Sequence, residues 1–434
     1  MKSNSSIGGD FLISLNELYT VTIEDVNIFG NGVCRIENTV VFVDKVLIGE
    51  ICEIEIVRIY KSYAYGKVKR IIKKSEERAK IACSHFGNCG GCSFLHTTFE
   101  NENRIKEKYV KDTFKKAKIE IDVEKICAPI ECEYRNKIVL FFDGEGFGYK
   151  KEKTNEIVIH EKCILNEYVF DKIAKESAKL FKGKGVRAIS IRKSTDDEIT
   201  LCVITCEELS LVEYVSKITI LVPEIRNIFY SVCSDKEIVL EKQKYIRIYG
   251  EGYIYDSLCD LRFRISPESF YQVNHLCAEK LYEKVVSLAD LSKDSKCADL
   301  FCGTGTIGII CAKRTGSKVY GVEIVEKAIE DAKYNAELNA ITNVRFEAQD
   351  ASKFNEKVDT IIIDPPRKGL SKFMIDTLLR LNPQKIVYVS CNVDTLVRDI
   401  KVLTKEYVIS SPVSIFNMFP KTSHVESVVC LRKE

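Results

Sequence analysis

The sequence predicts a multidomain protein with a small all-β barrel, a central mixed α/β domain and a C-terminal doubly wound, Rossmann-like α/β domain. Its 434 residues exceed what a single hydrophobic core usually organises. Short strand-like runs fill the first part of the chain, and apolar strands alternate with amphipathic helices in the last part. These patterns place the domains at residues 11–73, 74–261 and 262–434.

Composition and charge limit the classes of protein to which this chain can belong. With 45% hydrophobic residues the chain can bury extensive cores, and its net charge of +2 does not by itself indicate a polyanionic partner. The N-terminal residues lack the apolar segment and cleavage site of a signal peptide, and no uncharged apolar run approaches the ~20 residues of a membrane span. We therefore expect a cytoplasmic protein whose 18 cysteines do not form a disulfide framework.

The first domain is predicted from five short strands between residues 17 and 72, with a glycine turn at residues 30–32. Such strands suit a small OB-like barrel. Residues 58–80 contain nine Lys or Arg against two Glu, with Tyr60, Tyr63 and Tyr65 among them. Basic residues suit phosphate contacts and tyrosines suit base stacking, although a solvated surface has the same composition. The turn, the strand VFVD and the lysine-rich exit resemble a TRAM domain, an RNA-binding module.

The central domain is predicted from strand-like runs within residues 119–260 and one helix near 166–182. A cysteine cluster and a charged helical stretch precede it. The cluster has the spacing C-x5-C-x2-C, formed by Cys83, Cys89 and Cys92. Cysteine thiolates bind zinc or an iron–sulfur cluster, so the residues alone leave both metals open. A redox Cys-x-x-Cys pair is less favoured, because no thioredoxin-like pattern surrounds it.

The C-terminal domain is predicted as a seven-stranded, mostly parallel sheet. Helical patterns separate its early strands, which is the arrangement of a doubly wound fold. The final strand follows its predecessor closely and fits an antiparallel position. The expected strands lie near residues 297–301, 318–323, 344–347, 359–363, 385–389, 406–413 and 426–431.

A glycine-rich turn, DLFCGTG at residues 299–305, joins the first of these strands to a helix. Gly303 and Gly305 let the backbone approach a ligand, and the helix beginning at Thr306 offers N–H groups to an anion. Glu323 ends the next strand, where an acid accepts hydrogen bonds from ribose hydroxyls. The pattern suits a dinucleotide or S-adenosylmethionine. We favour the methyl donor mostly because of the motifs later in the chain, and also because the third glycine of the dinucleotide motif is missing at its usual spacing.

Three residues at predicted strand ends carry candidate chemistry. Asp364 is held at the carboxyl edge of the sheet by the two prolines that follow it. Arg367 stands where amine-directed methyltransferases commonly have an aromatic residue. Cys391 follows the fifth strand next to a helix whose N-terminus would lower a thiol pKa, with a buried structural cysteine as the alternative. Glu426 enters the last strand; a glutamate there is unremarkable by itself, and only its pairing with Cys391 makes it a candidate base.

Together DLFCGTG, DPPRKG, VSCNVD and HVESVV resemble the RNA (uracil-5-)-methyltransferases, which form 5-methyluridine. The resemblance covers nearly the whole chain and implies a class I methyltransferase fold with S-adenosyl-L-methionine as cofactor. It implies that Cys391 adds to C6 of uracil, that C5 accepts the methyl group and that Glu426 removes the C5 proton. The target uridine must be flipped out of folded RNA.

The resemblance also implies further site residues. Phe270 would lie against the target base and Arg135 would contact RNA. Asp350 would reach the adenine, although it also suits a helix N-cap. Cys163 would be the fourth ligand of a [4Fe–4S] cluster, with zinc less favoured. The implied cofactor residues are Gln272, Phe301, Gly303, Gly305, Thr306, Glu323, Asp350 and Asp364, and the implied cluster ligands are Cys83, Cys89, Cys92 and Cys163.

The expected function is methylation of uridine C5 in RNA. Ribosomal 23S RNA is favoured as substrate because the TRAM-like barrel and the cysteine cluster resemble the ribosomal branch. Methylation of a uridine in the T-loop of transfer RNA is the nearest alternative. Two other classes compete: an amine-directed RNA methyltransferase, which would form no covalent adduct, and a non-catalytic RNA-binding metalloprotein, which would transfer no methyl group.

Overall fold

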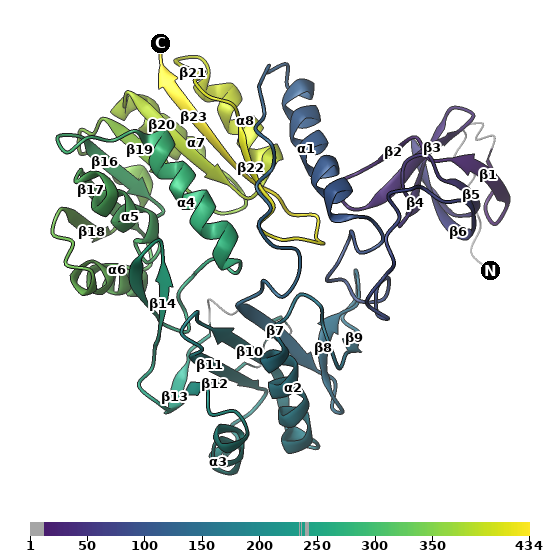
Figure 1. The fold of residues 1–434 in the computed structure, drawn as a ribbon, viewed down its shortest axis with the longest axis horizontal. Coiled ribbons are helices and arrows are strands. Elements are labelled where there is room, and N and C mark those ends of the chain that lie inside the picture. The colour runs from purple at the N-terminus through teal and green to yellow at the C-terminus, as the bar shows by residue number, and fades with distance from the viewer. Residues whose placement is uncertain (1–12, 234, 236, 239–242) are drawn as a thin grey trace. The chain divides into compact units, whose positions relative to one another are not determined.

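The computed structural model describes residues 13–233, 235, 237–238 and 243–434, which form two compact units (Figure 1). The first unit comprises the described residues up to Phe86 together with Cys92–Tyr109 and Lys421–Ser423. The second comprises Gly87–Gly91, Val110–Pro420 and His424–Glu434. Among the described residues, none of the helices combines the length and apolarity needed to cross a membrane. The three domain boundaries drawn from the sequence stay a prediction.

A six-stranded sheet of order β1-β5-β6-β4-β3-β2 dominates the first unit. Its β4–β6 pair is parallel and the other pairs are antiparallel. Alternate side chains such as Val41, Val43 and Ile54 are buried, as expected for strands with one face in a core. The sequence predicted five strands, and the two-residue β2 is the addition. The strands are β1 (Leu18–Thr22), β2 (Asp25–Val26), β3 (Asn31–Ile36), β4 (Thr39–Asp44), β5 (Ile51–Ile59) and β6 (Tyr63–Lys73).

Helix α1 (Phe99–Lys116) carries a buried ion pair in its first turns, within the first unit. Lys106 Nζ lies 2.9 Å from Glu102 Oε1, and both side chains are fully buried. The same carboxylate oxygen accepts a hydrogen bond from the backbone N–H of Lys421 at 2.8 Å. Residues 421–423, which lead toward Glu426, are thereby fastened to this unit.

The second unit begins with a seven-stranded sheet of order β13-β12-β11-β10-β7-β8-β9. Helices α2 (Tyr168–Phe181) and α3 (Val212–Leu221) pack against it through a core that includes Phe170, Phe181 and Tyr214. The helix predicted near 166–182 is therefore confirmed. The strands are β7 (Lys137–Phe142), β8 (Phe147–Lys150), β9 (Ile157–Ile159), β10 (Val186–Lys193), β11 (Ile199–Thr205), β12 (Ile225–Val232) and β13 (Ile246–Tyr249).

A hairpin of β14 (Ile254–Leu258) and β15 (Leu261–Ile265) precedes the last sheet, which has eight strands. Its path is β18-β17-β16-β19-β20-β23-β21, and β22 pairs with β23 outside that path. The sixth predicted strand, near 406–413, was wrong in detail, since Ser411-Pro412 separates two short strands and proline cannot donate to a ladder. The strands are β16 (Lys296–Leu300), β17 (Lys318–Glu323), β18 (Val344–Ala348), β19 (Thr360–Ile363), β20 (Lys385–Ser390), β21 (Tyr407–Ile409), β22 (Ser414–Phe416) and β23 (Glu426–Lys433).

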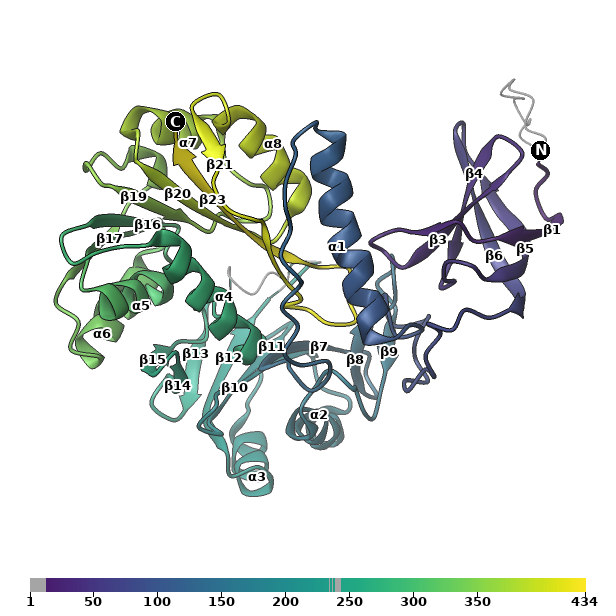
Figure 2. The ribbon, with the colours of Figure 1, turned by 45° about the horizontal axis from the view of Figure 1, so that its top comes forward.

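Helices cover both faces of this sheet (Figure 2). On one face α4 packs beside α5 and α5 beside α6, and on the other α7 packs beside α8. The first five strands of the path are parallel, and β23 is antiparallel to β20 as predicted. The helices are α4 (His275–Ala289), α5 (Thr306–Thr315), α6 (Glu326–Leu338), the short 3-10 helix η2 (Ala351–Lys353), α7 (Lys372–Leu381) and α8 (Val393–Leu403).

Candidate active site

Cys391 and Glu426 come together because β20 and β23 are neighbouring antiparallel strands. Their register pairs Ser390 with Ser427, so Cys391, just after β20, and Glu426, at the start of β23, stand opposite each other. On its other side Glu426 is paired with Phe416 of β22. The structure thus places the predicted nucleophile and the predicted base at one edge of the sheet.

Two carboxyl groups at this edge, those of Glu426 and Asp364, have raised pKa values. Burial, and then the charge of Asp364, raises the pKa of Glu426 well above its ordinary value. Burial raises the pKa of Asp364, which follows β19, to about 7. Both carboxyl groups are therefore better proton acceptors, once ionised, than exposed ones would be.

The pKa of Cys391 departs from the sequence prediction. Burial, followed by the charges of Glu426 and Asp364, raises it to about 11, and Arg367 opposes this shift. The expectation that helix α8 lowers this pKa in the free protein was wrong. Asn392 caps the helix with its own side chain, which accepts a hydrogen bond from Asp394 N at 3.1 Å, while the two acids face the sulfur.

The loop after Asp364 is fastened to α8. Asn392 Nδ2 donates to the carbonyl of Arg367 at 3.2 Å. The buried carboxylate of Asp399 accepts hydrogen bonds from Leu370 N and from the Tyr388 hydroxyl, each at 2.8 Å. Sequence reasoning missed Asp399, although an acid on the otherwise apolar buried face of α8 was a visible signal. These bonds fasten residues 367–370, which closely follow Asp364, to α8 and β20.

The glycine-rich turn has the backbone geometry that its residues predict. Phe301, Gly303 and Gly305 have positive φ angles of 67°, 54° and 79°. A Cβ atom on Gly305 would lie 2.7 Å from Phe346 Cζ, so only glycine fits there. The turn delivers the chain into α5, whose first residue, Thr306, is buried. Backbone N–H groups at the start of α5 lie at the carboxyl edge of the sheet, where ligands of such folds bind.

Asp299 adds a group that the sequence did not single out as a ligand. Its Oδ2 accepts a hydrogen bond from Gly308 N at 2.8 Å. Among the described residues its Oδ1 has no hydrogen-bond partner, although the side chain is fully buried. Burial raises the pKa of Asp299 to about 7. An orphaned buried acceptor beside this turn suits a cationic group such as the ammonium of a methionine moiety.

Glu323 and Asp350 end neighbouring strands. Glu323 Oε2 accepts from Gly303 N at 3.3 Å and Oε1 accepts from Ile324 N at 2.8 Å, so its carboxylate joins the glycine turn to the end of β17. Asp350 caps η2 by accepting from Ser352 N at 2.9 Å, which confirms the capping alternative; a contact with adenine stays a prediction.

Gln272 and Phe270 differ sharply in exposure. Gln272 is buried and Phe270 is 69% exposed. Hydrogen bonding links the Gln272 side chain to Tyr282, whose pKa is raised by burial and by the charge of Asp364. Arg135 lies between two tyrosines, with its guanidinium carbon 5.9 Å from the ring centre of Tyr134 and of Tyr149. Its predicted contact with RNA stays a prediction.

The four predicted cluster cysteines are divided between the two compact units. Cys83 and Cys92 belong to the first unit and Cys89 and Cys163 to the second. Within the described residues, no group of three or more His, Cys, Asp or Glu side chains is close enough to hold a metal ion. Burial raises the pKa of Cys163 to about 11, with the charge of Cys89 contributing. The residue types suit an iron–sulfur cluster, which stays a prediction.

Comparisons with known proteins match two parts of the chain to described families. Residues 15–69 match the TRAM domain, and residues 233–434 match the family described as tRNA (Uracil-5-)-methyltransferase. An RNA methyltransferase of Halalkalibacterium halodurans is 33% identical, over 96% of this chain and 98% of that protein. One of Clostridium acetobutylicum is also 33% identical, over 97% of this chain and 98% of that protein.

The fold has a counterpart of known structure. The Pyrococcus abyssi tRNA (uracil-54, C5)-methyltransferase, solved in complex with S-adenosyl-L-homocysteine, superposes with a TM-score of 0.78 at 27% identity. The match covers 95% of this chain and 100% of that one. The chain therefore belongs to the family of S-adenosylmethionine-dependent RNA (uracil-5-)-methyltransferases.

Proposed function

We propose that this protein methylates C5 of a uridine in 23S ribosomal RNA, with Cys391 as nucleophile and Glu426 as base. The observation that carries the proposal is the β20–β23 register, which sets the thiol opposite the buried carboxyl group. Covalent catalysis at C5 needs a nucleophile on one carbon of the uracil double bond and a base for the proton on the other. Amine methylation needs neither, so the pair favours the uracil reaction.

The chain's residues would act in sequence. The thiolate of Cys391 adds to C6 of uracil, and the electron pair of the double bond moves toward C5 and O4. C5 then forms its bond to the methyl group as the bond between methyl and donor sulfur breaks. Glu426 takes the proton from C5, and the returning electron pair restores the double bond and expels Cys391 as thiolate.

S-adenosyl-L-methionine would supply the electrophilic methyl group when bound. The orphaned Asp299 Oδ1 suits its ammonium, and the N–H groups at the start of α5 suit its carboxylate. Glu323 suits the ribose hydroxyls. Because Gly305 has no side chain, the cofactor can approach the backbone closely at this turn. Gln272 and Asp364 border the methionine end in this proposal.

RNA would also bind an aromatic surface of the first unit, formed by Phe42, Tyr60, Tyr63 and Tyr65. The rings of Tyr60 and Tyr63 are stacked with centroids 4.8 Å apart, and Tyr65 meets Tyr63 edge-on at 5.8 Å. Arg58 donates to the Tyr60 hydroxyl at 3.0 Å. Partly exposed rings beside basic side chains offer stacking and phosphate contacts to unpaired nucleotides.

Transfer RNA is the second candidate substrate, because the matched family and the superposed Pyrococcus abyssi enzyme are both described by tRNA. That structure covers 95% of this chain, so the N-terminal unit does not distinguish the two substrates. The cysteine spacing supports the ribosomal choice.

The same proposal includes a [4Fe–4S] cluster on Cys83, Cys89, Cys92 and Cys163, supported by their spacing and residue type. No catalytic step involves it, and its role would be in folding or RNA docking. Anaerobic purification followed by iron and sulfide analysis tests it. Four iron atoms per chain that are lost in Cys163→Ser support the cluster, and zinc or no metal contradicts it.

The deciding experiment supplies labelled methyl donor and RNA from cells that lack this protein. Ribosomal and transfer RNA are separated afterwards and the labelled nucleoside is identified. Label in 5-methyluridine of 23S RNA is expected. Label confined to transfer RNA would show that transfer RNA, and not 23S RNA, is the substrate. Label in a base methylated on an amine would overturn the mechanism.

A further inference from the structure

Residues 266–273 form an irregular loop between β15 and α4 that carries both Phe270 and Gln272. Four of its side chains are buried: Ser266 is 7% exposed, Ser269 4%, Tyr271 5% and Gln272 6%. Phe270 between them is 69% exposed. A loop without its own hydrogen-bond ladder holds such a pattern only if other elements bind its backbone.

Asn136, at the entry to β7, binds this loop at two successive carbonyl groups. Its backbone N–H donates to Val273 O and its side-chain Nδ2 donates to Gln272 O, both at 2.9 Å. Its own carbonyl accepts from Lys193 N at 2.8 Å, so the residue is fixed to the central sheet. Asn136 is buried and therefore has little freedom to release the loop.

Arg192 of β10 binds the loop at its other end. Its Nη2 donates to Ser269 O at 3.0 Å, and its guanidinium carbon lies 6.0 Å from the Tyr271 ring centre. Among the described residues, its Nε and Nη1 have no hydrogen-bond partner, although the side chain is buried. A buried guanidinium so incompletely paired adds little to stability, which favours a positional role.

The loop is also held by two residues of the C-terminal part of the chain, outside the strands of its sheet. Ser269 Oγ donates to Asp331 Oδ2 of α6 at 2.7 Å, and Asn274 Nδ2 donates to Met418 O at 3.1 Å. We propose that Asn136 and Arg192 are positioning residues that set the place of Gln272 and Phe270 for RNA methylation. The inference rests on the proposed function, in which Gln272 borders the cofactor and Phe270 the target base.

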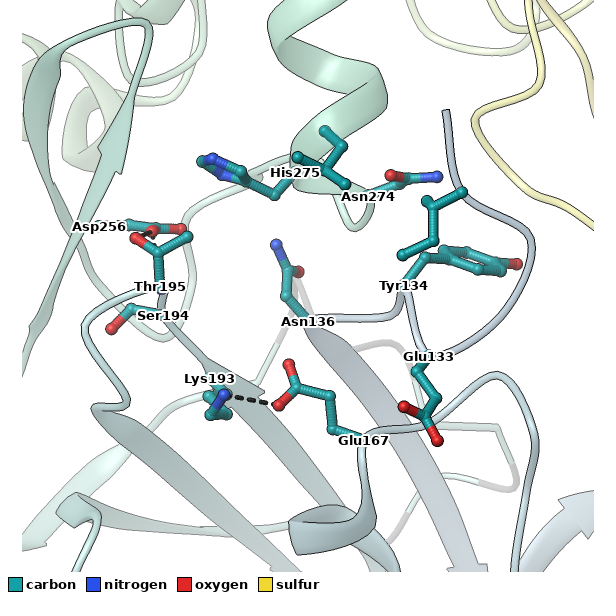
Figure 3. Close-up of a pocket in the computed structure, with 12 residues that line it drawn as sticks. Glu133, Tyr134, Asn136, Glu167, Lys193, Ser194, Thr195, Asp256, Asn274 and His275 are labelled. Carbon is teal, nitrogen blue, oxygen red and sulfur yellow. Dashed lines mark hydrogen bonds and ion pairs between the residues drawn. The ribbon is translucent and has the colours of Figure 1, made fainter. Parts of the chain in front are cut away.

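The space around Asn136 makes substitutions there informative. Figure 3 shows its side chain directed toward Asn274 and His275, at a pocket of about 130 Å³. Neighbours do not fill this pocket, so truncation of Asn136 enlarges a void and frees the loop rather than letting new contacts replace the lost ones. Asn136→Asp is the cleaner change, since it keeps the size and replaces the donor to Gln272 O with a carboxylate oxygen, which repels that carbonyl.

Asn227 of β12 offers a matched control. Asn227 is fully buried, and its Nδ2 donates to the carbonyl of Tyr253 at 2.7 Å. Its Oδ1 accepts a hydrogen bond from Gly252 N. Asn227→Asp would keep that acceptor and, like Asn136→Asp, would replace the donor to one loop carbonyl. That loop carries none of the proposed cofactor or substrate residues.

The test compares the purified full-length wild type with Asn136→Asp, Arg192→Met, Arg192→Lys and Asn227→Asp. Affinity for S-adenosyl-L-homocysteine is measured by calorimetry, KM and kcat by methyl transfer, and Tm by thermal melting. We expect Asn136→Asp and Arg192→Met to weaken the binding of S-adenosyl-L-homocysteine roughly tenfold and to raise the KM for the methyl donor by a similar factor. This is the effect of a lost buried hydrogen bond. Arg192→Lys, which keeps one charged donor, should recover part of the affinity.

Asn227→Asp should lower Tm by a similar amount while leaving cofactor affinity at the wild-type value. The inference is overturned if Asn136→Asp and Arg192→Met bind the product as the wild type does, or if Asn227→Asp weakens binding equally. Should one variant fail to fold, the other carries the test. Failure of the proposed function would show separately, as a wild type that binds the product but forms no 5-methyluridine.

Discussion

Replacing Glu426 with glutamine should stop the reaction after methyl transfer without disturbing the fold. Glutamine has nearly the same shape, so the pairing of this position with Phe416 and the Ser390–Ser427 register should persist. It cannot accept the C5 proton, so Cys391 stays bonded to the methylated base. General-base catalysis contributes roughly 100- to 10 000-fold to rate, and we expect kcat to fall by that order while a covalent RNA adduct accumulates.

The same substitution should stabilise the protein at high pH. Because burial raises the pKa of Glu426, the folded protein binds this proton more tightly than the unfolded chain does. That stabilisation is complete below the ordinary value of 4.5 and is lost as pH rises through the raised folded-state pKa. Glutamine does not ionise, so the free energy of unfolding of Glu426→Gln should exceed that of the wild type above this pKa, and the difference should shrink in acid.

Denaturing gels with labelled RNA measure the adduct, and urea titrations at pH 5 and pH 9 measure the two stabilities. The control is a double variant with Cys391→Ala and Glu426→Gln, which should form no adduct. Wild-type turnover by Glu426→Gln, or an adduct that survives loss of Cys391, would refute the reasoning. A variant that loses both activity and stability at high pH would show that Glu426 stabilises the fold and does not act as the base that removes the C5 proton.

Three further outcomes follow from the same edge of the sheet and from the first unit. Wild-type affinity for S-adenosyl-L-homocysteine should fall as pH drops below the Asp299 pKa of about 7, because the ionised acid binds the ammonium, whereas Asp299→Asn should bind weakly at every pH in calorimetric titrations. Gly305→Ala should abolish that binding and cost about 1–3 kcal/mol of stability in urea titrations, since its φ is positive and its Cβ would press on Phe346. Tyr60→Ala and Tyr63→Ala should each weaken RNA binding by about 1–3 kcal/mol in filter assays and leave product affinity unchanged.

Features that depend on local order along the chain were predictable, and features that depend on distant backbone groups were not. Cys391 and Glu426 stand at strand ends that the apolar runs reveal, and strand order then brings them together. The raised pKa of Cys391 was not foreseeable, because it arises from burial and from two acids, Glu426 and Asp364, that belong to other segments of the chain. Asn136 and Asp399 were missed as organising residues for the same reason, since each acts on carbonyl or N–H groups of a segment far away in sequence.

The high pKa of Cys391, about 11, indicates how the nucleophile is controlled. With Glu426 and Asp364 beside it, the sulfur is a thiol at neutral pH, and a thiol neither attacks uracil nor oxidises readily. Positive charge brought to this edge would lower the pKa, as Arg367 already does in part. The reactive thiolate would then form mainly when cofactor and RNA are in place.

Alkylation of Cys391 by iodoacetamide, followed peptide by peptide in mass spectra, measures this control. In the free protein the rate should rise toward a midpoint near the raised pKa of about 11. A cofactor analogue with an amine in place of the sulfonium methyl should move the midpoint down, while the uncharged thioether product should move it less. A midpoint near 8.5, the ordinary value for cysteine, in the free protein would show that the neighbouring acids do not restrain the thiol. It would also remove the reason for expecting chemistry to wait for the cofactor, since the nucleophile would then be available before either ligand arrives.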